Sequence, residues 1–504
     1  MRRLADLPFL VVLMGIGALA MLLPAAFAYG QRDMHVARVF LYGALLFLML
    51  TAIIGIASAV PRSRDSSRSH LLALAGVFVL LPVMLAVPFH QAVRDTSFLN
   101  AYFEMVSSLT TTGATLFDQP GRLSEAVHLW RALVGWLGGF LMWVVAISLL
   151  APLELGGFEL TTSEGGSDRG GNDRIGDARD RPERLVRHAR MLLPIYIGLT
   201  LLLWLGLVLA GDRAFVAACH AMSALATSGI SPVGGVQNGQ AGLAGEALIF
   251  LMLILALTRR SFLFEAGRSP LAGLWCDPEF RLGMGAVLVL ALLLNLRHWI
   301  AAFEVDEQEN LSAALRALWG GIFTVMSFLT TTGFESADWS STRSWSGLET
   351  TGLLLAGLAL VGGGVGTTAG GVKLLRVIAL YFHAQREIER MIYPSSVRGA
   401  VRGSRHIRSE GAYIAWVVFS LYALSVALLM VLLALAGLDF ESASAFAIAA
   451  YTTTGPLAQM AGDMPLSYTA LGDWAKAIVI LAMVMGRLGT LALIALLNPD
   501  LWRR

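Results

Sequence analysis

Apolar runs of about 20 residues recur along most of this sequence, and that length is what an α-helix needs to cross the hydrocarbon core of a bilayer. Only 14% of the residues are charged and 56% are hydrophobic, whereas about a quarter of the residues in a soluble domain are charged. Backbone polar groups inside a bilayer must be satisfied within the protein, which favours helices. The runs therefore predict an all-α polytopic membrane protein and argue against a soluble multidomain enzyme.

A short motif that ends in glycine recurs four times along the chain. Three copies read Thr-Thr-Thr-Gly and end at Gly113, Gly333 and Gly455, and a degenerate copy reads Ala-Thr-Ser-Gly and ends at Gly229. The copies are roughly 100 to 120 residues apart, and each follows a short apolar stretch, which is typical of one structural unit used four times. Such a chain would build a pseudo-fourfold pore by itself.

The apolar runs between these motifs indicate how the chain is divided. Four units, each a helix, a re-entrant pore helix with its loop and a second helix, are predicted to surround one central pore. The short helices are expected at 99–109, 214–226, 311–329 and 442–451, with N-caps at or near Asn100, Asp212, Ser312 and Asp439. Their brevity predicts that each enters and leaves the membrane on one side. The predicted divisions are two additional N-terminal transmembrane helices at 1–69, repeats at 70–156, 187–278, 279–408 and 409–504, and a cytoplasmic linker at 157–186.

Lys and Arg cluster in segments that would share one side of the membrane, among them 62–68, 163–190 and 386–408. The positive-inside rule makes that side cytoplasmic, together with both chain termini, and opens the short loops to the outside. The N-terminal stretch through Ala26-Phe27-Ala28 resembles a signal peptide, but its apolar run is long enough to span the membrane, so we expect a retained helix.

The four loops carry the chemistry. A cation that leaves water loses tens of kcal/mol of hydration unless other ligands replace it, and rings of backbone carbonyls can supply those ligands. Glycine permits backbone angles closed to other residues, and the C-terminal end of each short helix would direct negative dipole charge at the centre. One such motif alone would be an ordinary helix C-cap. Four copies at the ends of half-length helices favour a cation filter instead.

Four segments of the chain resemble hallmarks of the Trk/Ktr/HKT superfamily of potassium transporters. They are FEMVSSLTTTGATLF at 103–117, FLTTTGFE at 328–335, VGGGVGTTAGGVK at 361–373 and MGRLGTLALIALLNPDLWR at 485–503. The resemblance runs nearly end to end, and the two additional N-terminal helices make it strongest to the bacterial Trk membrane subunit. One departure is the second loop, which lacks the triple threonine.

The resemblance implies a potassium-translocating subunit of the bacterial cytoplasmic (inner) membrane. Its implied partners are a second copy in a homodimer and a cytoplasmic ring of nucleotide-binding regulatory subunits, with no nucleic acid. K⁺ is the implied transported ion, and no bound organic cofactor is expected in this chain. The implied cation ligands are backbone carbonyls, with Gly113, Gly229, Gly333 and Gly455 completing the filter: Thr111, Thr112, Thr227, Ser228, Thr331, Thr332, Thr453 and Thr454.

A glycine cluster interrupts the long apolar segment of the third repeat. Each glycine disfavours helix by about 1 kcal/mol relative to alanine, so a break is expected at Gly362, Gly363, Gly364, Gly366 and Gly370. The alternative is close packing of continuous helices through small residues. The resemblance implies an intramembrane gate loop that includes Thr367 and Thr368, and it implies that Arg487 contacts this loop or forms an electrostatic barrier. The alternative for Arg487, as for Lys373, is that the side chain snorkels to the interface.

The sequence leaves one alternative to potassium transport and argues against another. A sodium-permeable or proton-coupled cation symporter is the alternative, because one glycine per loop makes a short filter. A membrane-embedded enzyme would need clustered His, Asp or Glu at membrane depth, and the sequence has no such cluster and no Gly-Lys-Ser/Thr phosphate loop. Glu104 and His220 on the short helices are expected to satisfy local hydrogen bonds or face the outer vestibule. The net charge of +2 gives no reason to expect nucleic-acid binding.

Overall fold

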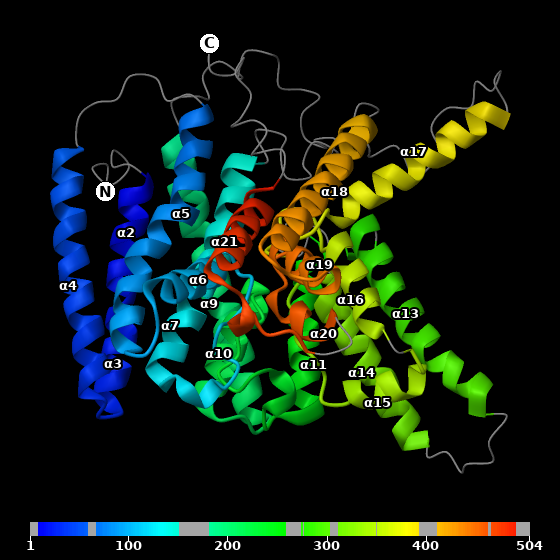
Figure 1. Cartoon of the computed structure of the whole chain (residues 1–504), viewed down its shortest axis with the longest axis horizontal. Helices are drawn as coiled ribbons and strands as arrows, with labels where there is room; N and C mark the ends of the chain where they lie inside the picture. The colour runs from blue at the N-terminus through cyan, green and yellow to red at the C-terminus, as the bar shows by residue number, and fades with distance from the viewer. Residues whose placement is uncertain are drawn as a thin grey trace.

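The computed structural model describes residues 9–58, 67–150, 181–258, 274–275, 277–302, 311–348, 350–392, 411–461 and 465–489. These residues form helices and connecting loops, with no strand among them (Figure 1). Eight helical segments within the described ranges are long and apolar enough to cross a membrane. The prediction of an all-α polytopic membrane protein is therefore confirmed, whereas the predicted repeat boundaries stay predictions.

The N-terminal helices form one flank of the molecule. They are α2 (Phe9–Ala20), α3 (Leu22–Gly30) and α4 (Met34–Ala57). The first predicted span is thus divided between α2 and α3, although both still belong to one apolar segment from Phe9 to Gly30. The Asp33 carboxylate accepts a hydrogen bond from the Val36 amide and so begins α4.

The remaining helices follow the predicted order of long, short and long only in part, because Gly242–Leu253 and Thr351–Val361, where long helices were expected, have 12 and 11 residues. They are α5 (Ser67–Ala92), α6 (Phe98–Leu109), α7 (Glu125–Val145), α9 (Arg181–Leu209), α10 (Ala214–Ala226), α11 (Gly242–Leu253), α13 (Pro278–Ala302), α14 (Leu311–Leu329), α15 (Trp339–Ser346), α16 (Thr351–Val361), α17 (Leu374–Ile392), α18 (Gly411–Leu435), α19 (Phe440–Tyr451), α20 (Ala458–Ala461) and α21 (Asp473–Leu488). We call α6, α10, α14 and α19 the loop helices, because each ends directly before one of the four glycine motifs or, for α10, at its first residue.

The length of one loop helix and three of the four N-caps differ from the sequence-based expectation. The third, α14, has 19 residues and is long enough to span a membrane, so brevity is not common to all four. The cap of α6 is Ser97, whose hydroxyl accepts from the Asn100 amide. Asp212 caps no helix, because its carboxylate binds other backbone amides, and Ser312 lies inside α14. Asp439 caps α19 as expected.

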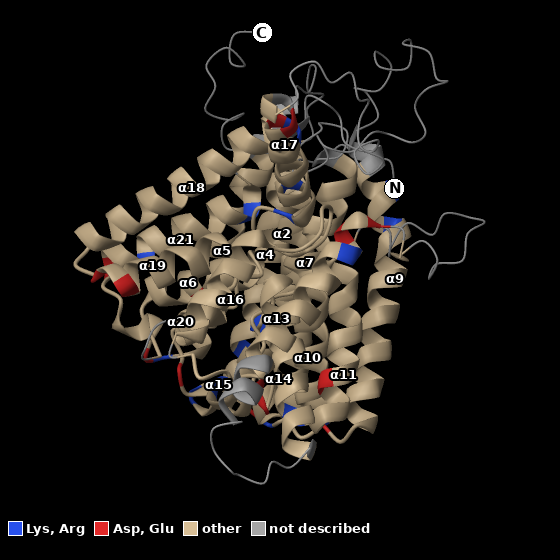
Figure 2. Cartoon of the chain, turned by 90° about the vertical axis from the view of Figure 1, so that its right-hand side faces the viewer, with Lys and Arg blue, Asp and Glu red and all other residues tan. Residues whose placement is uncertain are grey.

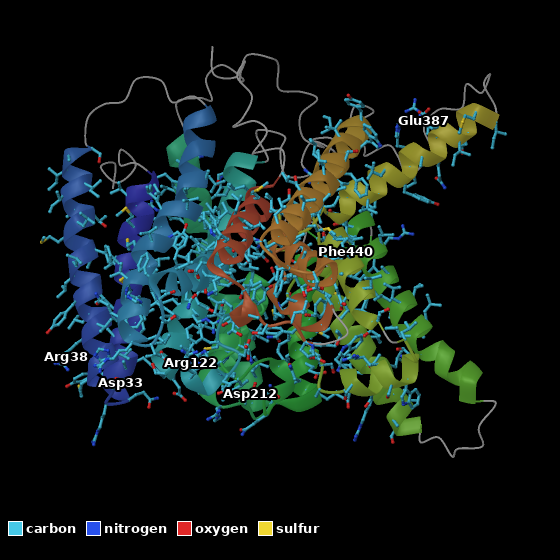
Figure 3. The ribbon with its side chains drawn as sticks, in the orientation of Figure 1. Asp33, Arg38, Arg122, Asp212, Glu387 and Phe440 are labelled. Carbon is cyan, nitrogen blue, oxygen red and sulfur yellow. The ribbon has the colours of Figure 1, made fainter. Side chains whose placement is uncertain are left out.

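The distribution of polarity is inside out relative to a soluble protein. Leu45, Leu202 and Leu424 are among the exposed side chains on the outer faces of the helices, while the threonines of the loops are buried. Charged side chains are sparse over the helical body in Figure 2. In Figure 3, Asp33, Arg122 and Asp212 lie toward one end of this body and Glu387 toward the other. Such an arrangement is stable where lipid surrounds the helices.

Several predicted features lie wholly or largely outside the described residues. They are the linker at 157–186, of which 157–180 is not described, the basic segments at 62–68 and 393–408, and the chain end from 490 onward. The orientation of the chain in the membrane, which was deduced from those basic segments, therefore stays a prediction.

Candidate cation pore

All four loops make the same unusual backbone turn. The threonine two residues before each glycine has a left-handed φ, at +54° for Thr111, +49° for Thr227, +56° for Thr331 and +56° for Thr453. This conformation is a genuine outlier for a β-branched residue. The degenerate second loop adopts it as well, so its departure in sequence does not change the turn at Thr227.

A shared hydrogen bond closes each turn onto its loop helix. The amide of the residue before the glycine donates to a carbonyl five residues earlier, at 2.8 Å in the first, third and fourth loops and 3.0 Å in the second. The donors are Thr112, Ser228, Thr332 and Thr454. The four loops are therefore positioned alike at the C-terminal ends of four helices.

The loops touch one another where their glycines lie. A Cβ atom added at Gly113 would stand 1.9 Å from the carbonyl oxygen of Ser228 in the second loop. A Cβ added at Gly229 would stand 2.3 Å from the carbonyl oxygen of Thr332 in the third loop. Both distances are far inside van der Waals contact, so only glycine fits where each loop meets the next.

The remaining two contacts close the ring. The third loop meets the fourth where a Cβ at Gly333 would lie 3.0 Å from the ring of Pro456. The fourth meets the first through a hydrogen bond of 2.6 Å from the Gly455 amide to the Thr112 carbonyl. Segments from four distant parts of the sequence thus form one closed ring, and a carbonyl oxygen faces the neighbouring loop at three of its four junctions.

The threonine hydroxyls beside the ring are largely engaged in holding the loops. The hydroxyls of Thr110, Thr330 and Thr452 donate back to carbonyls four residues earlier, at 2.7, 2.9 and 2.8 Å. No charged side chain belongs to the four motifs themselves. Across the described ranges, no group of three or more His, Cys, Asp or Glu is arranged for a metal ion.

The glycine cluster forms an irregular segment between α16 and α17, which we call the glycine segment (362–373). Its Gly370 amide donates to the Thr331 hydroxyl at 2.7 Å, and the Thr227 hydroxyl donates to that of Thr368 at 3.0 Å. A Cβ at Gly370 would lie 2.1 Å from the Thr452 carbonyl. The segment therefore lies against the second, third and fourth loops, and the predicted break in the long helix is confirmed.

The rest of the glycine segment is fastened to neighbouring helices. The Gly364 amide donates to the Ala256 carbonyl at 3.0 Å, and the Val365 amide donates to Glu279 at 2.9 Å. Gly362 and Gly366 have left-handed φ values of +73° and +72°. Gly363 also lies where a larger residue would not fit, because a Cβ there would lie 2.6 Å from the Ala369 methyl. The Thr367 hydroxyl donates to the Gly364 carbonyl within the segment.

Arg487 contacts this segment directly. The side chain is buried in α21, and its Nη1 donates to the Thr368 carbonyl at 2.6 Å. Its Nε and Nη2 have no hydrogen-bond partner among the described residues. Lys373 donates to the Ala369 carbonyl within the same segment. Arg487 thus does not snorkel to the interface, and the expected contact with the glycine segment is present.

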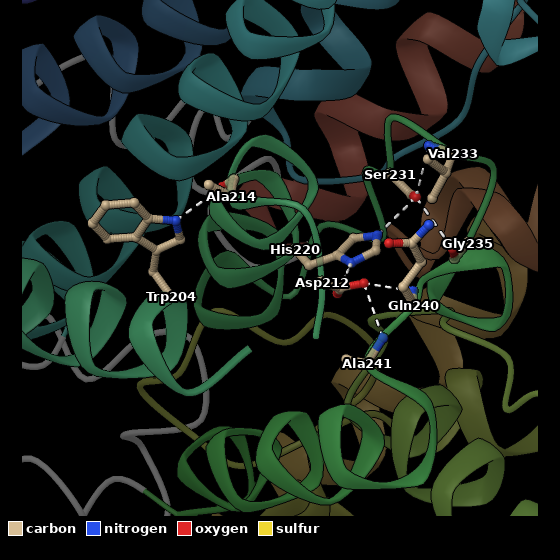
Figure 4. A network of polar contacts seen from close by, with 9 residues as sticks. All are labelled: Trp204, Asp212, Ala214, His220, Ser231, Val233, Gly235, Gln240 and Ala241. Carbon is tan, nitrogen blue, oxygen red and sulfur yellow. Dashed lines mark hydrogen bonds and ion pairs between the residues drawn. The ribbon is translucent and has the colours of Figure 1, made fainter. Parts of the chain in front are cut away.

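Buried polar side chains around the ring brace the loops. Glu104 lies 2.8 Å from Arg131 and accepts a hydrogen bond of 2.6 Å from the Leu116 amide. His220 pairs with the Ser231 hydroxyl at 2.9 Å (Figure 4). Both residues satisfy local hydrogen bonds, as expected from the sequence.

Sequence reasoning missed Glu246 on α11. Its carboxylate accepts hydrogen bonds from the indole of Trp319, the hydroxyl of Ser336 and the amide of Ala337, at 2.8, 2.8 and 2.7 Å. A lone carboxylate within an apolar helix is the signal that could have pointed to it. It fastens the segment after the third loop to a helix from the preceding part of the chain.

Comparison with known proteins agrees with this architecture. The family model described as TrkH, cation transport protein, matches residues 43–234 and 249–501. The Trk system potassium uptake protein TrkH of Salmonella typhimurium is 30% identical over 96% of both chains. The protein of the same name from Halomonas elongata is 31% identical over 88% of this chain and 87% of its own.

A solved structure matches the whole molecule. The crystal structure of the potassium transporter TrkH from Vibrio parahaemolyticus superposes with a TM-score of 0.83 at 26% identity, and each chain is covered completely. The match of the family model to most of the sequence, the relatives at about this level of identity and the fold agree. This chain therefore belongs to the TrkH family of cation transport proteins.

Proposed function

We propose that this chain is the ion-conducting subunit of a potassium uptake system in the bacterial cytoplasmic membrane. The observation that carries the proposal is the closed ring of four glycine loops, each with the same left-handed threonine. The relatives named as Trk system potassium uptake proteins support potassium as the ion. The pore is pseudo-fourfold within a single chain, and cations enter it from outside.

The cation ligands are the eight backbone carbonyls predicted from the sequence. They belong to Thr111, Thr112, Thr227, Ser228, Thr331, Thr332, Thr453 and Thr454. Carbonyl oxygens replace the hydration shell of the ion as it enters, and the loop helices add the negative ends of their dipoles. Because the Thr112 carbonyl accepts from the Gly455 amide, an ion at that oxygen competes with one hydrogen bond across the ring.

The glycine segment is the gate of this pore. Its hydrogen bonds to Thr227 and Thr331 hold it against the ring, and Arg487 fixes it from α21. Opening then requires that these contacts break together. The glycines at 362, 363, 364, 366 and 370 give the segment the backbone freedom for such a movement.

The complete system contains further subunits. We propose a homodimer of this chain and a cytoplasmic ring of nucleotide-binding regulatory subunits, with both termini of this chain on the cytoplasmic side. The wording "Trk system" in the names of its relatives supports an assembly of several components.

Complementation tests the proposed function. Expression of this chain in a bacterial strain without its own potassium uptake should restore growth in low-potassium medium and accumulation of ⁸⁶Rb⁺. A strain carrying the empty vector is the control. Growth that stays dependent on high potassium, with the protein present in the membrane, would refute the proposal.

The second candidate is a sodium-permeable or proton-coupled cation symporter, favoured by the short filter of one glycine per loop. Flux through the purified protein in vesicles at fixed voltage, with and without a proton gradient, separates the two. A flux that follows the potassium gradient alone supports a channel-like mode, and a flux driven by the proton gradient supports symport.

A further inference from the structure

One position on the loop helices contacts the outgoing chain in all four parts of the ring. It lies nine residues before each loop glycine and is occupied by Glu104, His220, Thr324 and Phe446. All four side chains are buried. The four residues have different chemistry, so the sequence alone gives no hint that they are equivalent.

Two of these residues hold the outgoing chain through an oxygen. Glu104 accepts from the Thr115 hydroxyl at 2.9 Å and from the Leu116 amide at 2.6 Å. The Thr324 hydroxyl accepts from the Ser336 amide at 3.2 Å. Leu116 and Ser336 occupy the same place, three residues after the loop glycine.

The fourth part of the ring uses aromatic packing for the same purpose. The ring of Phe446 packs on that of Tyr468 with 4.9 Å between centroids, and the Tyr468 hydroxyl donates to the Gly455 carbonyl at 2.9 Å. The loop glycine itself is thereby fastened to the position nine residues earlier.

In the second part of the ring, His220 lies between the segment after Gly229 and the connection from α9 to α10 (Figure 4). Its Nε2 pairs with the hydroxyl of Ser231, two residues after Gly229, at 2.9 Å, and its Nδ1 lies 3.7 Å from the Asp212 carboxylate. The Ser231 hydroxyl also reaches the Gly235 carbonyl, at the longer distance of 3.4 Å. In the tautomer with its hydrogen on Nδ1, facing Asp212, Nε2 accepts from this hydroxyl.

Asp212 is itself fixed by the backbone. Its carboxylate accepts from the amides of Gln240 and Ala241 at 2.6 and 3.0 Å, just before α11. Burial raises the pKa of Asp212, but the nearby imidazole of His220 and the hydrogen bonds from these amides outweigh burial and lower it overall. Asp212 is thus a carboxylate in this network, and it orients the imidazole from outside the loop helix.

We propose that His220 is the positioning residue of the degenerate second loop. In this proposal, the side-chain contacts from Asp212 to His220 and from His220 to Ser231 set the ion selectivity of that part of the ring. The proposal rests on the proposed function. The second loop lacks the hydroxyl of the first motif residue, because Ala226 stands where the others have Thr110, Thr330 and Thr452. Each of those hydroxyls donates to a carbonyl of its own loop helix. The second loop has no such bond, so its position depends more on the contact between His220 and Ser231.

Substitution of His220 tests this role. His220→Leu should lower the ratio of potassium to sodium uptake at least fivefold while the protein still reaches the membrane. His220→Gln should keep most of the ratio, because the glutamine amide reaches about as far as Nε2 and still pairs with Ser231. Val216→Ala on the same helix, a buried residue of purely apolar character, is the matched control.

A second variant keeps the proposal testable if His220→Leu does not fold. Ser231→Ala should lower the ratio as well, and the double variant should lower it no further than either single one, since both break the same contact. An unchanged ratio in Ser231→Ala, or a loss in Val216→Ala as large as in His220→Leu, would overturn the proposal. If the unsubstituted chain carries no potassium at all, the proposed function fails instead.

Discussion

Four threonines with left-handed backbone angles stand at matching places in this chain. A residue held in so sparsely populated a region costs on the order of 1–3 kcal/mol, and persists where its surroundings over-determine it. The surroundings here are the helix-end hydrogen bonds and the neighbouring loops of the ring. Strain of this kind collects at functional sites, which agrees with a role of these loops in ion coordination.

The close approach of neighbouring loops also explains why glycine is needed at the loop positions. Gly113→Ser should lower the selectivity for potassium over sodium about tenfold, equivalent to about 1.4 kcal/mol. Its Cβ would collide with the Ser228 carbonyl, and its φ of +74° is strained for serine. Competitive uptake of ⁸⁶Rb⁺ and ²²Na⁺ measures the ratio. Gly121→Ser is the control, because no atom lies within 4 Å of a Cβ there, and unchanged selectivity in Gly113→Ser would contradict the assignment of the ring.

Arg487 gives a second prediction for a single residue. Arg487→Gln removes the bond from Nη1 to the Thr368 carbonyl, and hydrogen bonds of charged groups are worth about 1.5–3 kcal/mol. The glycine segment should then leave its closed position more often, and the basal ion flux in vesicles without regulatory subunits should rise about tenfold. Arg38→Gln is the control, since that side chain bonds only within its own exposed helix turn. A flux no higher than that of the unsubstituted protein would show that Arg487 does not hold the gate closed.

At the scale of elements, the glycine segment acts as one piece between α16 and α17. Gly370→Ala should reduce potassium uptake at least tenfold, because its Cβ would lie 2.1 Å from the Thr452 carbonyl and force the segment away from the ring. Gly357→Ala, in the exposed interior of α16, is the matched change with no neighbour within 4 Å. It should instead stabilise the helix by up to about 1 kcal/mol. Equal uptake by the two variants would refute the close fit of the segment.

The elements also show what the sequence could and could not predict. Apolar length and the recurring glycine motif placed the loop helices closely, since both signals are local. The cap of α6 was misplaced, because Ser97 and Asn100 are both good capping residues. Asp212 was misassigned, because its carboxylate is used by amides 28 and 29 residues later. The contact between Thr227 and Thr368 joins residues 141 apart, and no local pattern encodes such a pairing.

At the scale of the whole molecule, no single part of the chain forms the ring, because its contacts join all four loops. The contact between the first and fourth loops, from Gly455 to Thr112, joins residues that are 343 positions apart in the sequence. Each quarter therefore contributes coordinating groups that exist as a set only when all helices are assembled. An ion that binds the ring binds the folded chain and not the unfolded one.

That dependence predicts stabilisation by potassium. Binding to the folded state alone stabilises it by RT ln(1 + [L]/Kd), about 2.7 kcal/mol at a ligand concentration of 100 Kd. The apparent Tm of the purified protein in detergent should therefore rise by several degrees in KCl relative to choline chloride at equal ionic strength, and by less in NaCl. Gly113→Ser should lose most of the shift and Gly121→Ser should keep it. If KCl and choline chloride give the same Tm for the unsubstituted chain, the ring does not bind potassium in this state. A ligand that binds only the folded protein always raises the free energy of unfolding, by mass action.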